Sequence, residues 1–477
     1  MNKFLYFQCL LIPAFLAFGS ISNQALYLRC YQRITGKSYF EIKSENSQQN
    51  YVAIKNEIKD PIEGCLELIT KVNIDPSSGI AQNNDNKELK SVFNNLNNYF
   101  NNMFSVKEYN PSTLSCNFSP LIDFIDIERK GLYFLRTLFT PDAKFSEAVT
   151  ATETYEYRRS AGVPDTLSFT VGGKNKVSDF VIELTNEQTS APLPALLEVG
   201  DIIGFKKANL LSFGSSVVDI RNWTNHYKGG VIGDKVYLKQ HLPNITADGA
   251  IKLERNFGQS FYKDFLCRDL PLVKLSDSKV FVDTSEDAVP FRQSASCVTC
   301  HASIDRLAMG MTHIGPANIR GGRCERVGEK FRIKGYRGVR KVVNFTQDNS
   351  FWPSSADPKF AGYKNQGRIF FRSYSGKLID VGFHGAEQLG AFLSQSEDFY
   401  ICQAKRAYNY LTGIDVNLNI YKGLDSEIEL SDNDKANYET VIAAGLELKK
   451  HQSFTKLLKE LMNSPSFKDE HYKRISQ

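Results

Sequence analysis

The stretch "SASCVTCHASID", residues 294–305, contains two cysteines three positions apart, and a histidine directly follows the second. Positions i, i+3 and i+4 share one face of an α-helix, so Cys297, Cys300 and His301 are expected to lie together on a short helix. The chain holds 9 Cys and 7 His among 477 residues. At that composition one such box arises by chance only about 0.0025 times. The pattern is therefore specific enough to predict a site.

In an exported protein this spacing is typical of c-type haem attachment. The two thiols can reach the two vinyl groups of one porphyrin, while His301 is aimed at its iron as the proximal ligand. We therefore expect one covalent haem c on Cys297, Cys300 and His301, with Ser294 or Ser296 as the helix cap. Two alternatives are weaker. Structural zinc needs four ligands, and no second Cys/His pair of similar spacing follows. A redox Cys-x-x-Cys pair normally opens a helix after a strand, and no convincing strand precedes the box.

The N-terminus predicts export. Lys3 is followed by an apolar run over 4–18, and small residues follow between 19 and 25. This is the plan of a secretory signal peptide, residues 1–25, with cleavage between about residues 19 and 25. The alternative is a membrane anchor, but the run is shorter than the ~20 residues that a spanning helix needs. We expect a periplasmic or secreted protein with no stable membrane span after cleavage.

Composition narrows the class further. Hydrophobic residues make up 42% and charged residues 23%, as in a globular protein. The net charge of +5 is spread along the chain without a Lys/Arg-rich run, which argues against nucleic-acid binding.

Cysteine usage fits an oxidising compartment. Cys9 leaves with the signal, and six cysteines remain outside the box: Cys30, Cys65, Cys116, Cys267, Cys324 and Cys402. An even number predicts up to three disulfides, whose connectivity stays open at this stage. Buried free thiols are the alternative.

Apolar spacing and turn residues predict a mainly α protein with short β-hairpins (α+β), in which a c-type haem-binding helical segment sits inside a larger helical protein. One hairpin is expected around Gly172–Gly173 and another within 367–383. After the signal we expect four regions. They are a helical N-terminal region with an Asn-rich linker (26–118), a mixed α/β middle domain (119–285), the haem c-binding segment (286–345), and a β-hairpin followed by a helical domain (346–477).

Several helix ends are predicted from capping residues. Gly36 and Gly413 are expected as left-handed caps, and Ser431 and Ser453 as N-caps of the last long helices. Residues 81–102 are rich in Asn and poor in aliphatics, so we expect a linker with a weak helix there.

The residues around the box carry a family resemblance. "CVTCHASIDRL" resembles the Cys-x-x-Cys-His-x-x-Ile/Met-Asp-Pro-Leu-Gly stretch of the large planctomycete-type cytochrome c proteins. "HYKGGVIGDKVYL" and "FLCRDLP" before the box, and "FHGAEQLGAFLSQSEDFYICQAKRAYNYLTG" and "FTKLLKELMNSPSF" after it, are similar in the same order. Arg306 and Ala308 stand where the family has Pro and Gly. The resemblance covers roughly residues 226–470 and implies an exported haem protein without specifying a reaction.

We expect an exported monohaem cytochrome that transfers single electrons or senses redox state, with an unidentified redox partner protein in the cell envelope. Two alternatives remain: a haem-dependent oxidoreductase or peroxidase, and an envelope interaction protein in which haem staples the fold. Both stay open because electron transfer alone needs only ~100 residues of scaffold.

The second axial ligand would separate these functions. A loop from Ala308 onward could fold over the haem edge, so Met311 is the preferred candidate. Met462 is expected to pack on an apolar helix face instead. The alternatives to Met311 are Met309, His313 and His384.

Overall fold

The computed structural model of the protein describes the chain in segments. They are residues 21–39, 41, 60–82, 86–104, 129–153, 155–157, 168–171, 180–185, 204–207, 228–234, 237–238, 241, 255–279, 295–311, 314–320, 325–327, 330–333, 335–341, 367–418, 421–422, 426–427 and 430–469. The expected architecture, mainly α with short β-hairpins, is confirmed for these residues.

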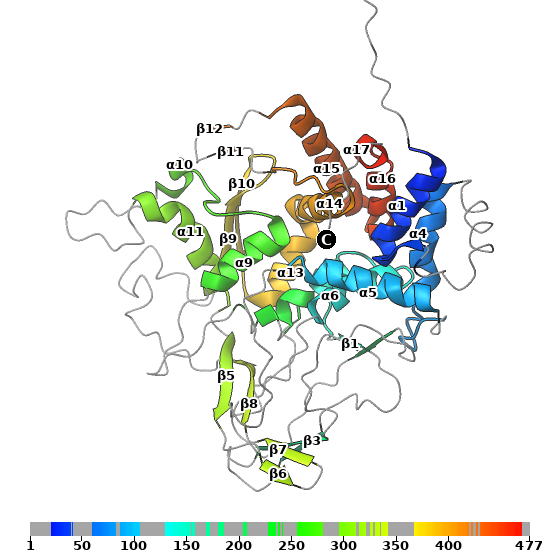
Figure 1. Cartoon of the computed structure of the whole chain (residues 1–477). Coiled ribbons are helices and arrows are strands. Elements are labelled where there is room, and N and C mark those ends of the chain that lie inside the picture. The colour runs from blue at the N-terminus through cyan, green and yellow to red at the C-terminus, as the bar shows by residue number, and fades with distance from the viewer. Residues whose placement is uncertain are drawn as a thin grey trace, which may run out of the picture.

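Three N-terminal helices pack together on one side of the molecule (Figure 1). They are α1 (Asn23–Thr35), α4 (Pro61–Val72) and α5 (Lys87–Asn101). A disulfide between Cys30 and Cys65 joins α1 to α4. Helix α1 ends at Gly36, whose φ of 72° is left-handed, as predicted.

Residues 81–102 were predicted to form a linker with a weak helix, and most of them form the 15-residue helix α5. Asn86 caps the helix by accepting hydrogen bonds from the backbone N–H groups of Glu88 and Leu89. Its apolar residues recur at helical spacing and are buried: Leu89, Val92, Phe93, Leu96 and Phe100. The many asparagines hid this amphipathic pattern, because their low helix propensity is outweighed by the burial of one face.

The middle of the chain contributes helices on both sides of the core. They are α6 (Arg129–Phe139), α7 (Glu147–Thr150), the 3₁₀ turn η3 (Gly230–Gly233), α9 (Arg255–Leu266), α10 (Leu275–Ser278) and α11 (Ala295–Met309). A second disulfide, Cys267–Cys402, ties the segment after α9 to the C-terminal helices.

The strands form small antiparallel sheets. β1 (Tyr155–Tyr157) pairs with β4 (Phe205–Lys207), and β5 (Ile314–Arg320) pairs with β8 (Gly335–Lys341). A sheet of order β2-β3-β7-β6 contains β2 (Ser168–Val171), β3 (Phe180–Thr185), β6 (Glu325–Val327) and β7 (Lys330–Ile333). β2 and β3 are the two runs predicted to pair around Gly172–Gly173. Two-residue strands β11 (Tyr421–Lys422) and β12 (Ser426–Glu427) also pair.

The hairpin predicted within 367–383 is confirmed. β9 (Gly367–Arg372) pairs with β10 (Leu378–Phe383), with Arg372 opposite Leu378 and Gly367 opposite Phe383. β9 is largely buried against α11, whereas most of β10 is exposed.

The C-terminal helices are α13 (Gly385–Gln395), α14 (Glu397–Thr412), α15 (Asp432–His451), α16 (Phe454–Met462) and α17 (Pro465–Lys468). Their predicted ends are confirmed. Gly413 ends α14 in the left-handed region, Ser431 accepts a hydrogen bond from Asp434 N–H, and Ser453 accepts one from Lys456 N–H.

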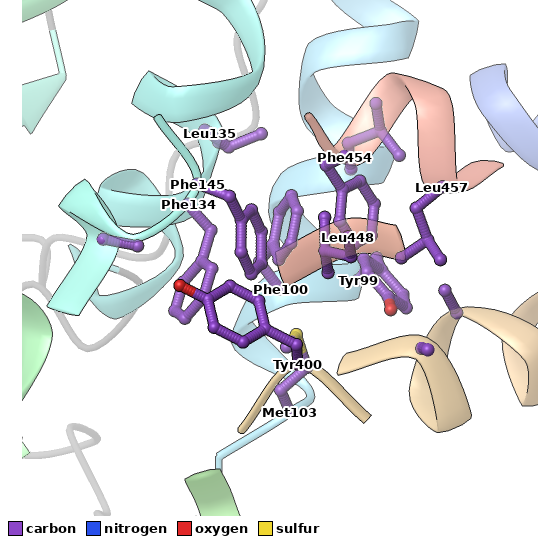
Figure 2. Close-up of a cluster of buried hydrophobic side chains, with 14 of the residues drawn as sticks. Tyr99, Phe100, Met103, Phe134, Leu135, Phe145, Tyr400, Leu448, Phe454 and Leu457 are labelled. Atoms are coloured by element: carbon purple, nitrogen blue, oxygen red, sulfur yellow. The ribbon is translucent and has the colours of Figure 1, made fainter. Parts of the chain in front are cut away.

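Aromatic rings fill the core between these helices (Figure 2). The ring of Phe145 lies 5.4 Å from that of Phe454 on α16, 5.5 Å from Phe134 on α6 and 6.0 Å from Phe399 on α14. The buried cluster to which they belong runs from Leu26 to Phe467. Among the residues that the structure describes, no helix has the length and apolar character needed to cross a membrane.

Candidate functional site

Helix α11 carries the Cys-x-x-Cys-His box and is held from two directions. It packs on α9 and on strand β9 (Figure 1). A small apolar cluster of Val273, Val298, Ala302 and Phe370 fastens the first turns of α11 to β9 and to the segment before α10. These contacts fix the position of α11 and of the box that it carries.

One face of α11, called the open face below, is only partly buried. Between residues 297 and 311 only Cys297, Cys300 and His301 are half-buried, and every other residue is buried. These three are the i, i+3 and i+4 positions that the sequence placed on one face, so that expectation is confirmed. Of the two predicted caps, Ser294 lies outside the described residues, and Ser296 is not the N-cap because α11 begins one residue earlier, at Ala295.

Both cysteines of the box are thiols. Four of the seven cysteines outside it form the two disulfides, whereas Cys9, Cys116 and Cys324 fall outside the described residues. Burial raises the pKa of the Cys300 thiol, and the neighbouring Thr299 only partly opposes this. A thiol–disulfide exchange site instead lowers the pKa of its attacking thiol. The redox-pair alternative thus gains no support.

His301 has a carboxylate partner that the sequence analysis missed. Its Nδ1 lies 3.1 Å from Oδ2 of Asp305, one turn further along α11. A carboxylate only accepts hydrogen bonds, so the proton of a neutral His301 belongs on Nδ1. Nε2 is then left with its lone pair, which is the form of histidine that binds a metal. The i+4 position of Asp305 is the sequence signal that could have indicated it.

Asp305 is in turn held from α9. Its Oδ1 lies 2.6 Å from Nε of Arg255, and its side chain is only 5% exposed. The two helices approach closely at Gly258, where a Cβ would lie 2.8 Å from the carbonyl oxygen of Ile304. The absence of a side chain at Gly258 allows α9 to bring Arg255 to the box.

A second arginine fixes the other side of α11. The guanidinium of Arg306 lies over the ring of Phe370, 4.7 Å from its centroid, and Nη2 lies 3.4 Å from Oδ1 of Asp380 on β10. Asp380 also accepts a hydrogen bond of 2.7 Å from Arg368 on β9. Arg306 thus attaches α11 to the β9–β10 hairpin.

Three of the candidate second ligands, Met309, Met311 and His384, lie at the C-terminal end of α11 or next to it. Met309 is its last residue, and Met311 is fully buried in the main core. His384 is exposed and adjoins this end, because the next residue, Gly385, donates a hydrogen bond to Gly310. Met309 lies eight positions after His301, about 12 Å along the helix axis. His313 lies outside the described residues.

Met462 is fully buried on the apolar face of α16, with its sulfur 3.4 Å from Cys30 Sγ. Within the described ranges, no group of three or more His, Cys, Asp or Glu side chains is arranged to hold a metal ion.

The donor set fits a covalent haem. Two half-buried thiols stand one turn apart, and a histidine whose Nδ1 faces the carboxylate of Asp305 follows on the same face. Comparison of the chain with models of known families, with curated proteins and with solved structures finds no match.

Proposed function

We propose that the protein is an exported monohaem c-type cytochrome that transfers single electrons or senses redox state in the cell envelope. The observation that carries the proposal is the open face of α11, where two thiols and one histidine are the only half-buried residues between 297 and 311. Helix α11 packs on α9 and β9 and is partly exposed on the face of the box. That face is where one planar haem would bind.

Each box residue has a distinct part in this proposal. Cys297 and Cys300 hold the haem through thioethers, and His301 binds its iron through Nε2. The bound haem supplies a reversible one-electron change of its iron. Asp305 keeps the proton of His301 on Nδ1, and the packing of α11 against α9 and β9 fixes the direction of the ring.

Export and an envelope redox partner belong to the same proposal. The disulfides Cys30–Cys65 and Cys267–Cys402 support it, because such bonds persist in oxidising compartments and are rare in the cytosol.

The proposal is tested by haem attachment. We expect the chain, exported from a host with a cytochrome c maturation system, to keep its haem through denaturing electrophoresis and to give the haemochrome spectrum of two thioethers. Cys297→Ala/Cys300→Ala should abolish the haem band. The matched control is Cys30→Ala/Cys65→Ala, which also removes two cysteines but should keep the haem.

Haem that extracts freely into acidified organic solvent from the unmodified chain would contradict the proposal. Haem that stays attached to the Cys297→Ala/Cys300→Ala variant would do the same.

The axial ligand opposite His301 stays a prediction, with Met311 preferred over Met309, His313 and His384. If Met311 is the ligand, the ferric protein shows the weak long-wavelength band of methionine ligation, and Met311→Ala abolishes it. Met462→Ala is the control, because that sulfur lies beside the Cys30–Cys65 disulfide and its loss should leave the band unchanged. A high-spin ferric spectrum that shifts on adding peroxide would instead favour a haem-dependent oxidoreductase.

A further inference from the structure

Three side chains form a hydrogen-bonded series behind the open face of α11. His301 Nδ1 lies 3.1 Å from Asp305 Oδ2, and Asp305 Oδ1 accepts a hydrogen bond of 2.6 Å from Arg255 Nε. Arg255 Nη2 lies 3.4 Å from Oδ2, so the guanidinium addresses both oxygens of the carboxylate. The series runs from a partly exposed imidazole through a buried carboxylate to a partly exposed cation.

Burial strengthens the electrostatic effect of Asp305 on His301. The side chain of Asp305 is 5% exposed, that of His301 is 20% exposed and that of Arg255 is 29% exposed. Charges in such a position are screened by water much less than charges on the surface. A carboxylate at this place therefore acts strongly on the ring that donates to it.

The direction of that effect follows from the chemistry of the ring. A carboxylate that accepts the Nδ1 proton pushes electron density onto the imidazole and makes Nε2 a stronger donor. A stronger donor, with a negative charge behind it, favours the more positive oxidation state of an iron bound at Nε2. Arg255 moderates the effect, because it shares the carboxylate and brings a positive charge of its own.

We propose that Asp305 and Arg255 are positioning residues with opposite effects on the iron: Asp305 stabilises the ferric state through His301, and Arg255 limits that stabilisation. The inference rests on the proposed function, because it concerns the iron that His301 would bind. It adds the setting of the reduction potential to the role of this site.

The experiment is a spectroelectrochemical titration of the full haem-bearing chain and three variants. Asp305→Asn keeps the shape and one acceptor oxygen and removes the charge. We expect the ratio of ferrous to ferric protein at a fixed potential to rise about tenfold, a shift of ~59 mV for a one-electron couple. Arg255→Gln should shift the midpoint the opposite way, because the carboxylate is left to His301 alone. A purely structural role would not produce shifts of opposite sign.

Asp380→Asn is the matched control. It is the same substitution in a carboxylate that also contacts an arginine next to the box, Arg306, but the hydrogen bonds of Asp380 go to Arg306 and Arg368 and not to His301. The midpoint potential of Asp380→Asn should equal that of the unmodified chain.

The outcomes separate the two proposals. A chain with thioether haem whose midpoint is the same in Asp305→Asn, or moves equally in Asp380→Asn, overturns the inference and leaves the cytochrome assignment intact. An unmodified chain without thioether haem overturns both. If Asp305→Asn does not fold, the more exposed Arg255→Gln decides the matter, and an unchanged or higher midpoint there contradicts the inference.

Discussion

Lys130 on α6 is a charged residue in the interior, with only 1% of its surface exposed. Its Nζ lies 5.1 Å from the centroid of the Phe104 ring, and the carboxylates of Asp234 and Asp264 act on it electrostatically. Burial lowers the pKa of Lys130 to about 8, although both carboxylates oppose the shift. Buried tyrosines share these acceptors: Tyr133 donates to Asp234 over 2.7 Å and Tyr237 to Asp264 over 3.3 Å. The lowered pKa of Lys130 thus makes the free energy of unfolding depend on pH.

We predict that the pH dependence of stability changes when Lys130 is replaced by Met. The pKa of Lys130 is about 8 in the folded chain and 10.5 in its ordinary state, so the unfolded chain holds more protons between these values. The contribution of Lys130 to the free energy of unfolding therefore increases as the pH rises from about 8 to 10.5. Below pH 8 the residue costs about 3 kcal/mol, the free-energy equivalent of the shift.

The measurement is urea unfolding at pH 7 and pH 9.5 for both proteins. The unmodified chain should gain about 2 kcal/mol relative to Lys130→Met between these pH values. Parallel profiles for the two proteins would contradict the lowered pKa.

At the scale of elements, close helix contacts depend on residues that lack side chains. Gly445 lies within the 20-residue helix α15, where glycine weakens a helix. A Cβ at Gly445 would lie 2.5 Å from the Cα of Ile401 on α14. The packing of α14 against α15 therefore requires glycine at this position, against its helix propensity.

We predict that Gly445→Ala destabilises the protein although alanine is the better helix former. Propensity alone would stabilise the variant by about 1 kcal/mol. The clash with the Ile401 backbone should outweigh this and give a net loss of about 1–3 kcal/mol, as in other overpacked cores. Ala443→Gly, at an exposed site of the same helix, measures the propensity contribution alone. A more stable Gly445→Ala variant would show that α14 and α15 are less closely packed.

At the scale of the whole molecule, two disulfides constrain very different lengths of chain. Cys30–Cys65 joins residues 35 apart, whereas Cys267–Cys402 joins residues 135 apart. The second bond spans the box helix and the β9–β10 hairpin within its loop. It therefore restricts the unfolded chain more than the first.

We predict that Cys267→Ala/Cys402→Ala loses more stability than Cys30→Ala/Cys65→Ala. The loop-entropy difference is about 1 kcal/mol, and each double variant should lose about 2–5 kcal/mol in all. Cys30, Cys65 and Cys402 are buried and Cys267 is half-buried, so the two disulfides are comparable in burial. Chemical unfolding of both variants at one pH provides the comparison, and a larger loss for the short loop would show that native packing around the sulfurs dominates.

Local patterns were sufficient for much of the fold. Gly36, Gly413, Ser431 and Ser453 end or begin helices as predicted, because capping depends on residues within one turn. The β9–β10 hairpin was predicted for the same reason. A linker with a weak helix was predicted where α5 is a long packed helix, because its asparagines have low helix propensity and its burial against α1, α4 and α6 was not visible in the sequence.

The sequence by itself determined that Cys297, Cys300 and His301 share one face, because they are neighbours on any regular helix. Only the tertiary structure decided what lies behind that face. Arg255 is 50 positions from Asp305 in sequence, and no periodicity relates them. The same holds for the pairing of Cys267 with Cys402 and for the approach of α9 at Gly258. Contacts of this kind depend on how whole helices pack, and one-turn periodicity carries no information about distant partners.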